Sequence, residues 1–250
     1  MSDEEMKSDS EISKKDIRNV LIFTIILAGL NLTYFIYIWH EFTILDYLVI
    51  LGVGVLAVAP AYLANAGMAL VGGGRPIDGG RTLFDGERIF GNGKTIRGFL
   101  GGFAIGSIGG YWLAIINPLI RNFAIAQILP PFPWVQSLKL VTPDEVFGVI
   151  GYDFFTNWDI FYIFRIQLLA VGAPLGDLLG SFLKRRFKVK RGGQFPMLDQ
   201  VDFVLVAIGI SYPLFWLRLH YILVLILLTP LIALLGNWVA YKIGKKTVPW

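Results

Sequence analysis

Six apolar segments constrain this chain more than any other feature of its sequence. A bilayer core requires about 20 mostly apolar residues per helix, and each segment reaches or approaches that length. The mean hydropathy is +0.64 and 16% of the residues are charged, whereas soluble domains contain about a quarter charged residues. The sequence therefore predicts an all-α, polytopic membrane bundle of about six transmembrane helices. The segments lie at about 20–39, 47–71, 97–116, 162–183, 203–217 and 221–241.

The segment at 203–217 is the shortest of the six. Arg218 and His220 are the polar residues that separate it from the last segment. The two segments can form a tight helical hairpin or a single re-entrant feature. We favour the hairpin, because an even number of spans places the basic C-terminal tail on the same side as the other basic regions.

Lysine and arginine cluster in four regions, at 1–19, 72–97, 184–201 and 242–246, which hold 18 of the 22 basic residues. Six spans put all four regions on one side, and the positive-inside rule identifies that side as the cytoplasm. We therefore expect a multi-pass protein of the cell membrane with both termini and both polar loops cytoplasmic. The segment at 117–161 falls on the opposite side, and its prolines predict an irregular external loop or half-helix.

The first polar loop reads GGGRPIDGGRTLFDGERIFGNGKTIRG and combines glycine with charges of both signs. Orientation in the membrane requires the basic residues but does not require Asp78, Asp85 or Glu87. Glycines let backbone N–H groups approach an anion closely, and mixed charges beside them suit a complex of metal and phosphate. This loop therefore predicts a phosphate-binding site.

The pentapeptide GNGKT in this loop is not a Walker A motif. Arg88 stands where that motif requires a glycine, and a membrane helix rather than a strand precedes the loop. The local chemistry still suits an anion, because Gly91 and Gly93 free the backbone and Lys94 supplies charge. Thr95 opens the next helix, whose N-terminus favours anions. The alternative is a glycine-bearing turn in which Thr95 is an ordinary N-cap.

The second polar loop reads LGDLLGSFLKRRFKVKRGGQFPMLDQVDF. Asp177 lies inside an apolar span, where a carboxylate is expensive and indicates function. It shares a helix face with Ser181 and Lys184. Asp199 and Asp202 lie one turn apart at the head of the next helix, so they can share a hard cation such as Mg²⁺. The alternative is that Asp199 caps this helix and Asp202 has no role.

These motifs resemble a known family of membrane enzymes. The second loop resembles the signature of CDP-diacylglycerol synthases, through GDL at 176–178, Ser181, KR at 184–185, LD at 198–199 and Asp202. Four further motifs resemble the archaeal branch of that family, the CDP-archaeol synthases. They are PAYLANAG (60–67), GGGRPIDGG (72–80), DGERIFGNGKTIRG (85–98) and GNWVAYKIG (236–244).

The chain departs from the family pattern in four places. Where bacterial relatives carry a lysine–aspartate pair, the chain reads KRGG, so one carboxylate is missing and the metal ligands must differ. QFPM stands where those relatives carry HGG. The first span and the 117–161 segment look like additions to an archaeal core of five spans. We therefore divide the chain into 1–46, a tail with an extra helix, and 47–250, a catalytic membrane domain with an external insertion at 117–161.

The resemblance implies transfer of the cytidylyl group of CTP to 2,3-di-O-geranylgeranylglycerol 1-phosphate, an isoprenoid ether lipid phosphate. Pyrophosphate would leave, and Mg²⁺ would be the cofactor. The nucleophile is already anionic, so the site must neutralise a triphosphate rather than supply a strong base. CTP, the lipid phosphate and the bilayer are the expected partners. No nucleic acid is expected, and the oligomeric state is left open.

The residues and the resemblance together assign the site. The expected metal ligands are Asp177, Asp199 and Asp202, and the expected catalytic residues are Lys94, Lys184, Arg185 and Asp199. The expected CTP contacts are Arg75, Asp78, Asp85, Arg88, Gly91, Asn92, Gly93, Lys94, Thr95, Arg97, Ser181 and Lys188. Asn65 is expected to contact the lipid, with an interhelical hydrogen bond as its alternative role.

Three other functions compete with this assignment, and one of them, a non-catalytic membrane scaffold, leaves the two dense polar loops unexplained. A CDP-diacylglycerol synthase acting on ester lipids would use the same chemistry, but the archaeal-type loop at 72–98 argues against it. A small membrane transporter would also place charge within spans. The intramembrane charge here is confined to Asp177, and no pseudo-repeat is visible in the sequence.

Overall fold

The computed structural model describes residues 14–38, 44–123, 160–189, 198–214, 217 and 219–242. These residues form helices joined by loops, which confirms the predicted all-α fold for the described part of the chain. Four of the helices are long and apolar enough to cross a membrane, and the bent pair α3–α4 makes a fifth candidate. The helices are α2 (Lys14–Ile38), α3 (Ile44–Ala57), α4 (Ala59–Val71), α5 (Ile96–Phe123), α8 (Ile160–Arg186), α9 (Leu198–Ser211) and α10 (Leu219–Lys242).

The predicted span at 47–71 is a broken helix, because α3 and α4 meet at an angle of 60°. Pro60 lies in the first turn of α4, so the N–H that would continue the helical hydrogen bonds of α3 is missing. The buried guanidinium of Arg165 donates a hydrogen bond of 3.0 Å from Nη2 to the carbonyl oxygen of Ala57. This bond satisfies a carbonyl at the end of α3, where helical partners run out.

The helix found for the predicted segment at 203–217 begins and ends earlier in the chain, at Leu198 and Ser211. Helix α9 has 14 residues and ends at Ser211, so it is about 21 Å long at 1.5 Å per residue. That length falls short of the hydrocarbon core of about 30 Å. The segments form two separate helices, α9 and α10, as a hairpin requires, but α9 does not reach the length of a span.

Glycines bring the helices of the bundle into close contact. A Cβ at Gly106 of α5 would lie 2.6 Å from the carbonyl oxygen of Pro60 on α4, and one at Gly172 of α8 would lie 2.5 Å from Cα of Ala207 on α9. Small residues allow such close approach of helices in membranes. The pairs α4–α5 and α8–α9 each border a polar loop, so this packing sets where the two loops meet.

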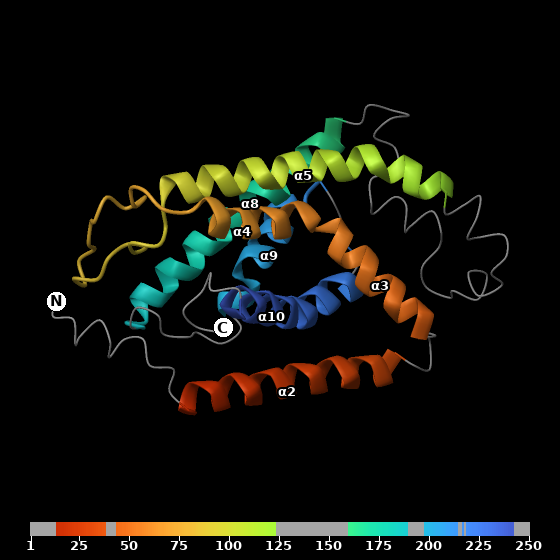
Figure 1. Cartoon of the computed structure of the whole chain (residues 1–250), viewed down its shortest axis with the longest axis horizontal. Helices are drawn as coiled ribbons and strands as arrows, with labels where there is room; N and C mark the ends of the chain where they lie inside the picture. Colours follow the sequence, from red (N-terminus) through yellow and green to blue (C-terminus); the bar gives the residue numbers. More distant parts are fainter. Residues whose placement is uncertain are drawn as a thin grey trace.

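Figure 1 shows that the helix ends bordering both polar loops lie at one end of the bundle. Helix α4 ends there, α5 begins there and α8 ends there, as do the start of α2 and the end of α10. The two ends of the described chain therefore share the side on which the polar loops lie. The cytoplasmic orientation of that side stays a prediction from the basic residues.

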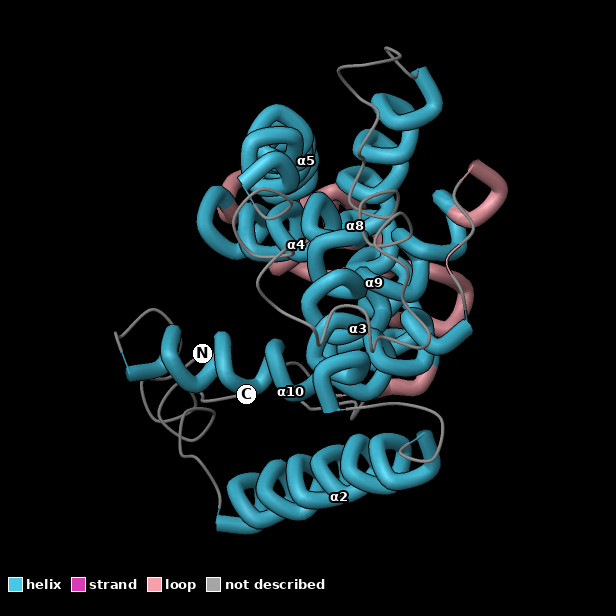
Figure 2. Tube along the Cα trace, turned by 90° about the vertical axis from the view of Figure 1, so that its right-hand side faces the viewer, coloured by secondary structure: helices cyan, strands magenta, loops and turns pink. Residues whose placement is uncertain are grey.

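Helix α2 lies at the edge of the bundle, against α10, as Figure 2 also shows. The amide of Asn31 donates from Nδ2 to the carbonyl oxygen of Leu227 at 3.1 Å. The hydroxyl of Tyr47 donates to Oδ1 of Asn31 at 3.3 Å. Helix α2 is therefore held by polar contacts that are remote from the loop end of the bundle.

The external segment predicted at 117–161 begins and ends inside helices. Helix α5 continues to Phe123 and α8 begins at Ile160. The remainder, 124–159, lies outside the described residues, so its predicted position on the external surface stays a prediction.

Candidate active site

Residues 72–95, the site loop, are folded by two short antiparallel pairings. At its base, the N–H of Ile77 donates to the carbonyl oxygen of Lys94 at 2.8 Å, and Pro76 lies opposite Thr95. Further out, residues 81–89 form a tip hairpin in which Thr82 lies opposite Arg88. The loop is therefore a defined structure that folds back on itself.

Asp78 organises this loop from within. Its carboxylate accepts hydrogen bonds from the backbone N–H groups of Gly80 (3.0 Å), Phe90 (3.1 Å) and Gly91 (2.9 Å), and from the guanidinium of Arg88. Burial acts to raise the pKa of Asp78, but these four donors outweigh it and hold the pKa well below its usual range. The buried carboxylate of Asp78 therefore holds the loop together, and the contact with CTP that was expected of it stays a prediction.

The GNGKT segment contains two glycines of different kinds. Gly91 has φ +115°, which strongly favours glycine, and its carbonyl oxygen accepts a bond from the N–H of Lys94 at 3.2 Å. Gly93 has an ordinary backbone, and a Cβ placed there would meet nothing within 4 Å. Thr95 is an N-cap, since its Oγ1 accepts the N–H of Gly98 at 3.1 Å. The conformation of the loop therefore favours glycine at 91 and a capping residue at 95, but it gives no reason for a glycine at 93.

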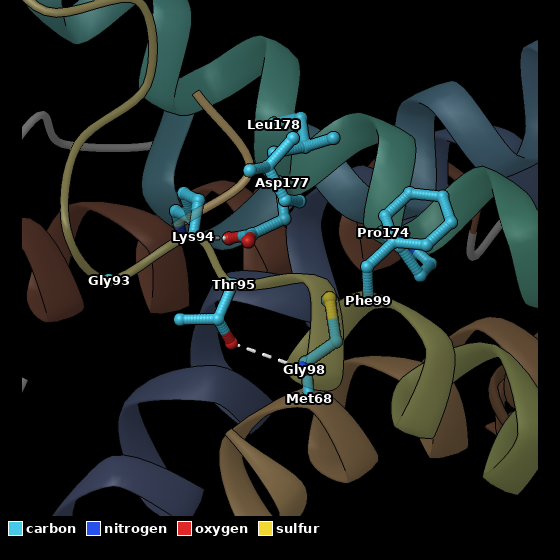
Figure 3. Close-up of a pocket in the computed structure, with 10 residues that line it drawn as sticks. Met68, Gly93, Lys94, Thr95, Gly98, Phe99, Pro174, Asp177 and Leu178 are labelled. Carbon is cyan, nitrogen blue, oxygen red and sulfur yellow. Dashed lines mark hydrogen bonds and ion pairs between the residues drawn. The ribbon is translucent and has the colours of Figure 1, made fainter. Parts of the chain in front are cut away.

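Lys94 links the site loop to α8. Its Nζ lies 2.6 Å from Oδ1 of Asp177, and both side chains are about a quarter exposed. Figure 3 shows the two side chains pointing toward each other beside a small open pocket. The pocket is lined by Met68, Ile77, Gly93, Lys94, Thr95, Gly98, Phe99, Pro174, Asp177 and Leu178. The two polar loops, far apart in sequence, therefore meet at one point.

Helices α8 and α9 bring the remaining carboxylates to the same region. Nζ of Lys184 lies 2.6 Å from Oδ1 of Asp199. A Cβ at Gly180 would lie 2.0 Å from Oδ2 of Asp202, so the absence of a side chain at 180 makes room for this carboxylate. Within the described ranges, no three acidic, histidine or cysteine side chains are placed to hold a metal together. Two of the expected metal ligands instead face lysines.

Arg186, the last residue of α8, was not among the predicted site residues. Its guanidinium reaches the tip hairpin, where Nη1 donates to Oδ2 of Asp85 at 2.5 Å. Nη2 donates to the carbonyl oxygens of Glu87 at 3.2 Å and Arg88 at 2.6 Å. The carboxylate of Asp85 was expected to contact CTP but is engaged in this contact. Arg186 therefore forms a second link between the site loop and α8.

Comparison with known proteins assigns the chain to a family. The family model described as CarS-like CDP-archaeol synthase matches residues 44–141 and 144–250. The chain belongs to this family. A CDP-archaeol synthase of Thermococcus gammatolerans is 37% identical over 193 residues, covering 77% of this chain and 92% of its own length. One of Methanococcoides burtonii is 40% identical over 197 residues, covering 76% and 99%.

A solved structure is similar to this chain in its fold. It is the structure of an intramembrane enzyme for archaeal membrane lipids biosynthesis, and it is 31% identical to this chain with a TM-score of 0.51. The similarity covers 73% of this chain and 91% of that chain. The match to the CarS-like family begins at residue 44, so α2 lies outside it. The segment at 117–161 lies inside it except for residues 142 and 143.

The other predicted site residues of this CarS-like chain surround the same end of the bundle. Arg75 and Arg97 are exposed at the base of the site loop, where the N–H of Ile96 donates to the carbonyl oxygen of Arg75 at 3.1 Å. Ser181 is buried on α8. Arg185 is half-buried, and Lys188 is exposed with φ 54°. Their roles toward a substrate stay predictions.

Two predicted residues have partners or surroundings that bear on their roles. Oδ1 of Asn92 accepts a hydrogen bond from Nη1 of Arg88, so both side chains are engaged inside the site loop. Asn65 is half-buried on α4. Among the described residues, no hydrogen bond to the Asn65 side chain is formed, so the interhelical bond that was its alternative role is not found there.

Proposed function

We propose that this protein is a CDP-archaeol synthase whose two polar loops together hold CTP at the membrane surface. The protein transfers the cytidylyl group of CTP to an isoprenoid ether lipid phosphate and releases pyrophosphate. The family match over residues 44–141 and 144–250 is the observation that supports this reaction. The contact between Lys94 and Asp177 supports the location of the site, because it joins the glycine-bearing loop to the acidic helix.

The cations of the site suit a triphosphate. Lys94 belongs to the site loop and Lys184 to the last turn of α8, and each is a compact charge on a flexible stem. Arg75 and Arg97 add exposed charge at the base of the site loop. Negative charge grows on the departing pyrophosphate, so donors placed there stabilise the transition state more than bound CTP. We assign Lys94 and Lys184 to this role.

The carboxylates of the site suit Mg²⁺. Asp177, Asp199 and Asp202 offer the hard oxygen donors that Mg²⁺ prefers, and such sites combine one or two carboxylates with substrate phosphates. When bound, Mg²⁺ would neutralise the triphosphate. The carboxylate of Asp202 has room against α8 only because residue 180 is glycine. This room supports Asp202 as a residue that would hold the ion, joined by Asp177 and Asp199 once these turn from their lysines.

The lysine–carboxylate pairs give these residues a common role. Lys94 neutralises Asp177, and Lys184 neutralises Asp199, each at 2.6 Å. On this proposal, each lysine turns to a phosphate when CTP and the cation bind together, and each carboxylate turns to the cation. Either ligand alone leaves one member of each pair without a partner. CTP should therefore bind much more weakly without Mg²⁺ than with it.

The proposal is tested with purified protein in detergent or nanodiscs. Pyrophosphate release is measured with each of the four nucleoside triphosphates, with the isoprenoid lipid phosphate or a diacyl lipid phosphate as acceptor, and with or without Mg²⁺. We expect release only with CTP, Mg²⁺ and lipid together, and faster with the isoprenoid acceptor. Equal release with both acceptors would favour a broader CDP-lipid synthase. No CTP-dependent release with either acceptor would overturn the proposal.

A further inference from the structure

Arg186, the last residue of α8, joins the helix to the tip hairpin of the site loop. Its side chain is 18% exposed, and three of its hydrogen bonds reach the tip hairpin: one to the Asp85 side chain and two to backbone carbonyls of Glu87 and Arg88. A guanidinium can make several bonds at once with a fixed geometry, which an ammonium group cannot. The contact therefore holds both a side chain and the backbone of the hairpin.

The guanidinium of Arg186 also packs against an aromatic ring of α8. Its central carbon lies 5.2 Å from the centre of the Phe182 ring, one turn earlier on α8. Phe182 in turn meets Phe90 of the site loop, with ring centres 6.5 Å apart. A cation over an aromatic face is attracted to it. Arg186 is thus fixed between a ring on α8 and the hairpin it contacts.

Arg88, in the tip hairpin, connects the hairpin to Asp78 inside the site loop. Arg186 holds the backbone carbonyl of Arg88, and the side chain of Arg88 contacts both Asp78 and Asn92. Asp78 then holds the N–H of Gly91 at 2.9 Å. A chain of direct contacts therefore leads from the end of α8 to the glycine turn beside Lys94.

We propose that Arg186 is a positioning residue that fastens the tip hairpin to α8 and so keeps the site loop shaped to receive CTP. This inference rests on the proposed function for its kinetic test, but its structural test does not. Both terminal nitrogens of Arg186 are engaged with the hairpin, so its role is exerted through the loop and not through the triphosphate. Asp85 is its partner in this role and is not a CTP ligand.

The structural test measures amide hydrogen exchange in the substrate-free protein. The N–H groups of Leu83, Gly86 and Ile89 are bonded within the tip hairpin. In Arg186→Gln, we expect their exchange to accelerate by about tenfold or more, because the hairpin opens locally without the fastening contact. Asp85→Asn should accelerate the same amides less, because the two carbonyl contacts remain. Arg81→Gln, an exposed charge on the same hairpin, should leave them unchanged.

The kinetic test is a double-mutant cycle. Arg186→Gln should raise the KM for CTP by about tenfold with a smaller change in kcat, as expected when a binding surface loses its preformed shape. Asp85→Asn should raise KM in the same direction, and the double variant should be little worse than Arg186→Gln alone. Arg186→Lys should recover part of the loss, because it restores the ion pair but not both carbonyl bonds.

Three results would overturn the inference. Unchanged amide exchange in Arg186→Gln would show that the hairpin does not depend on this contact. A rise in KM for Arg186→Gln with none for Asp85→Asn would place Arg186 directly on the nucleotide. Fully additive effects of the two substitutions would show that they act separately. A wild-type protein without CTP-dependent activity would refute the proposed function, and the exchange measurement would still decide whether Arg186 fastens the loop.

Discussion

The two halves of the site keep their shape by different means. The site loop is held from within, since Asp78 gathers backbone donors and Gly91 supplies a conformation that other residues rarely adopt. The α8–α9 half is held by the close approach of two helices, since a Cβ at Gly172 or Gly176 would collide with the backbone of α9. The first half therefore depends on local hydrogen bonds and the second on shape. Substitutions in the two halves should therefore differ in their effects on stability, binding and turnover.

The acidic residues of the α8–α9 half should show the largest effect. Asp199→Asn and Asp202→Asn keep side-chain size and remove charge, so we expect turnover to drop by at least about a hundredfold, the scale of one lost electrostatic stabiliser. The melting temperature should change little, because Asn keeps the packing of each site and a partly exposed ion pair such as Lys184–Asp199 contributes little to stability. Turnover is measured as pyrophosphate release at saturating CTP. Near-normal turnover in both variants would make these carboxylates structural.

The packing of the same half should dominate stability. In Gly176→Ala the new Cβ would lie 2.4 Å from the carbonyl oxygen of Asp202 and 2.6 Å from Cα of Phe203. The helices must separate, and overpacking of this kind costs about 1–3 kcal/mol. Thermal unfolding followed by tryptophan fluorescence should show a lower midpoint. Gly209→Ala on α9, where a Cβ meets nothing within 4 Å, is the matched control; equal midpoints would contradict the shape argument.

The glycines of the site loop should separate folding from binding. In Gly93→Ala the new methyl group meets open space, so the protein should keep its melting temperature, while the KM for CTP rises by about tenfold if the backbone approaches the nucleotide. In Gly91→Ala the strained φ should loosen the loop itself, which amide exchange without CTP would reveal. Unchanged kinetics for Gly93→Ala would place CTP away from this backbone.

The pH dependence of the site loop should be the smallest effect. The pKa of Asp78 is lowered on folding, so its contribution to stability is complete above its unfolded pKa of about 3.9 and is lost as the pH falls through the still lower folded pKa. Amide exchange at Phe90 and Gly91, corrected for its intrinsic rate, should show constant protection from pH 8 to about 5. Protection that declines across this range would show that another group holds the loop. Asp78→Asn should lower protection at every pH.

Apolar length was enough to predict where the helices lie but not how they are broken. The fold class and the six helical segments follow from hydropathy. The bend at Pro60 was missed because a broken helix and a straight helix can have equally apolar sequences. Arg165, which donates a hydrogen bond to the carbonyl at the break, lies more than a hundred residues away in the sequence. The end of the segment at 203–217 was predicted too late, because apolar residues continue beyond the end of α9 at Ser211.

The sequence predicted two polar loops that the structure brings together at Lys94 and Asp177, while the roles of their residues toward CTP and Mg²⁺ stay predictions. Asp78, Asp85 and Arg88 have the chemistry of a phosphate–metal site, yet the structure engages them with one another, with Arg186 or with the backbone. Which way a loop carboxylate faces depends on turn geometry that composition does not reveal. Arg186 had one available signal: it is the third basic residue of a run in which the family motif uses only two.

The broken helix α3–α4 has a consequence for how the chain enters the bilayer. Helix α3 has 14 residues and α4 has 13, so neither approaches the roughly 20 residues that a machinery sorting by length and hydropathy would retain as a span. Insertion of this region into the membrane then depends on α3 and α4 together. The site loop follows directly after α4, so its delivery to the correct face of the membrane depends on the two short helices being accepted as one.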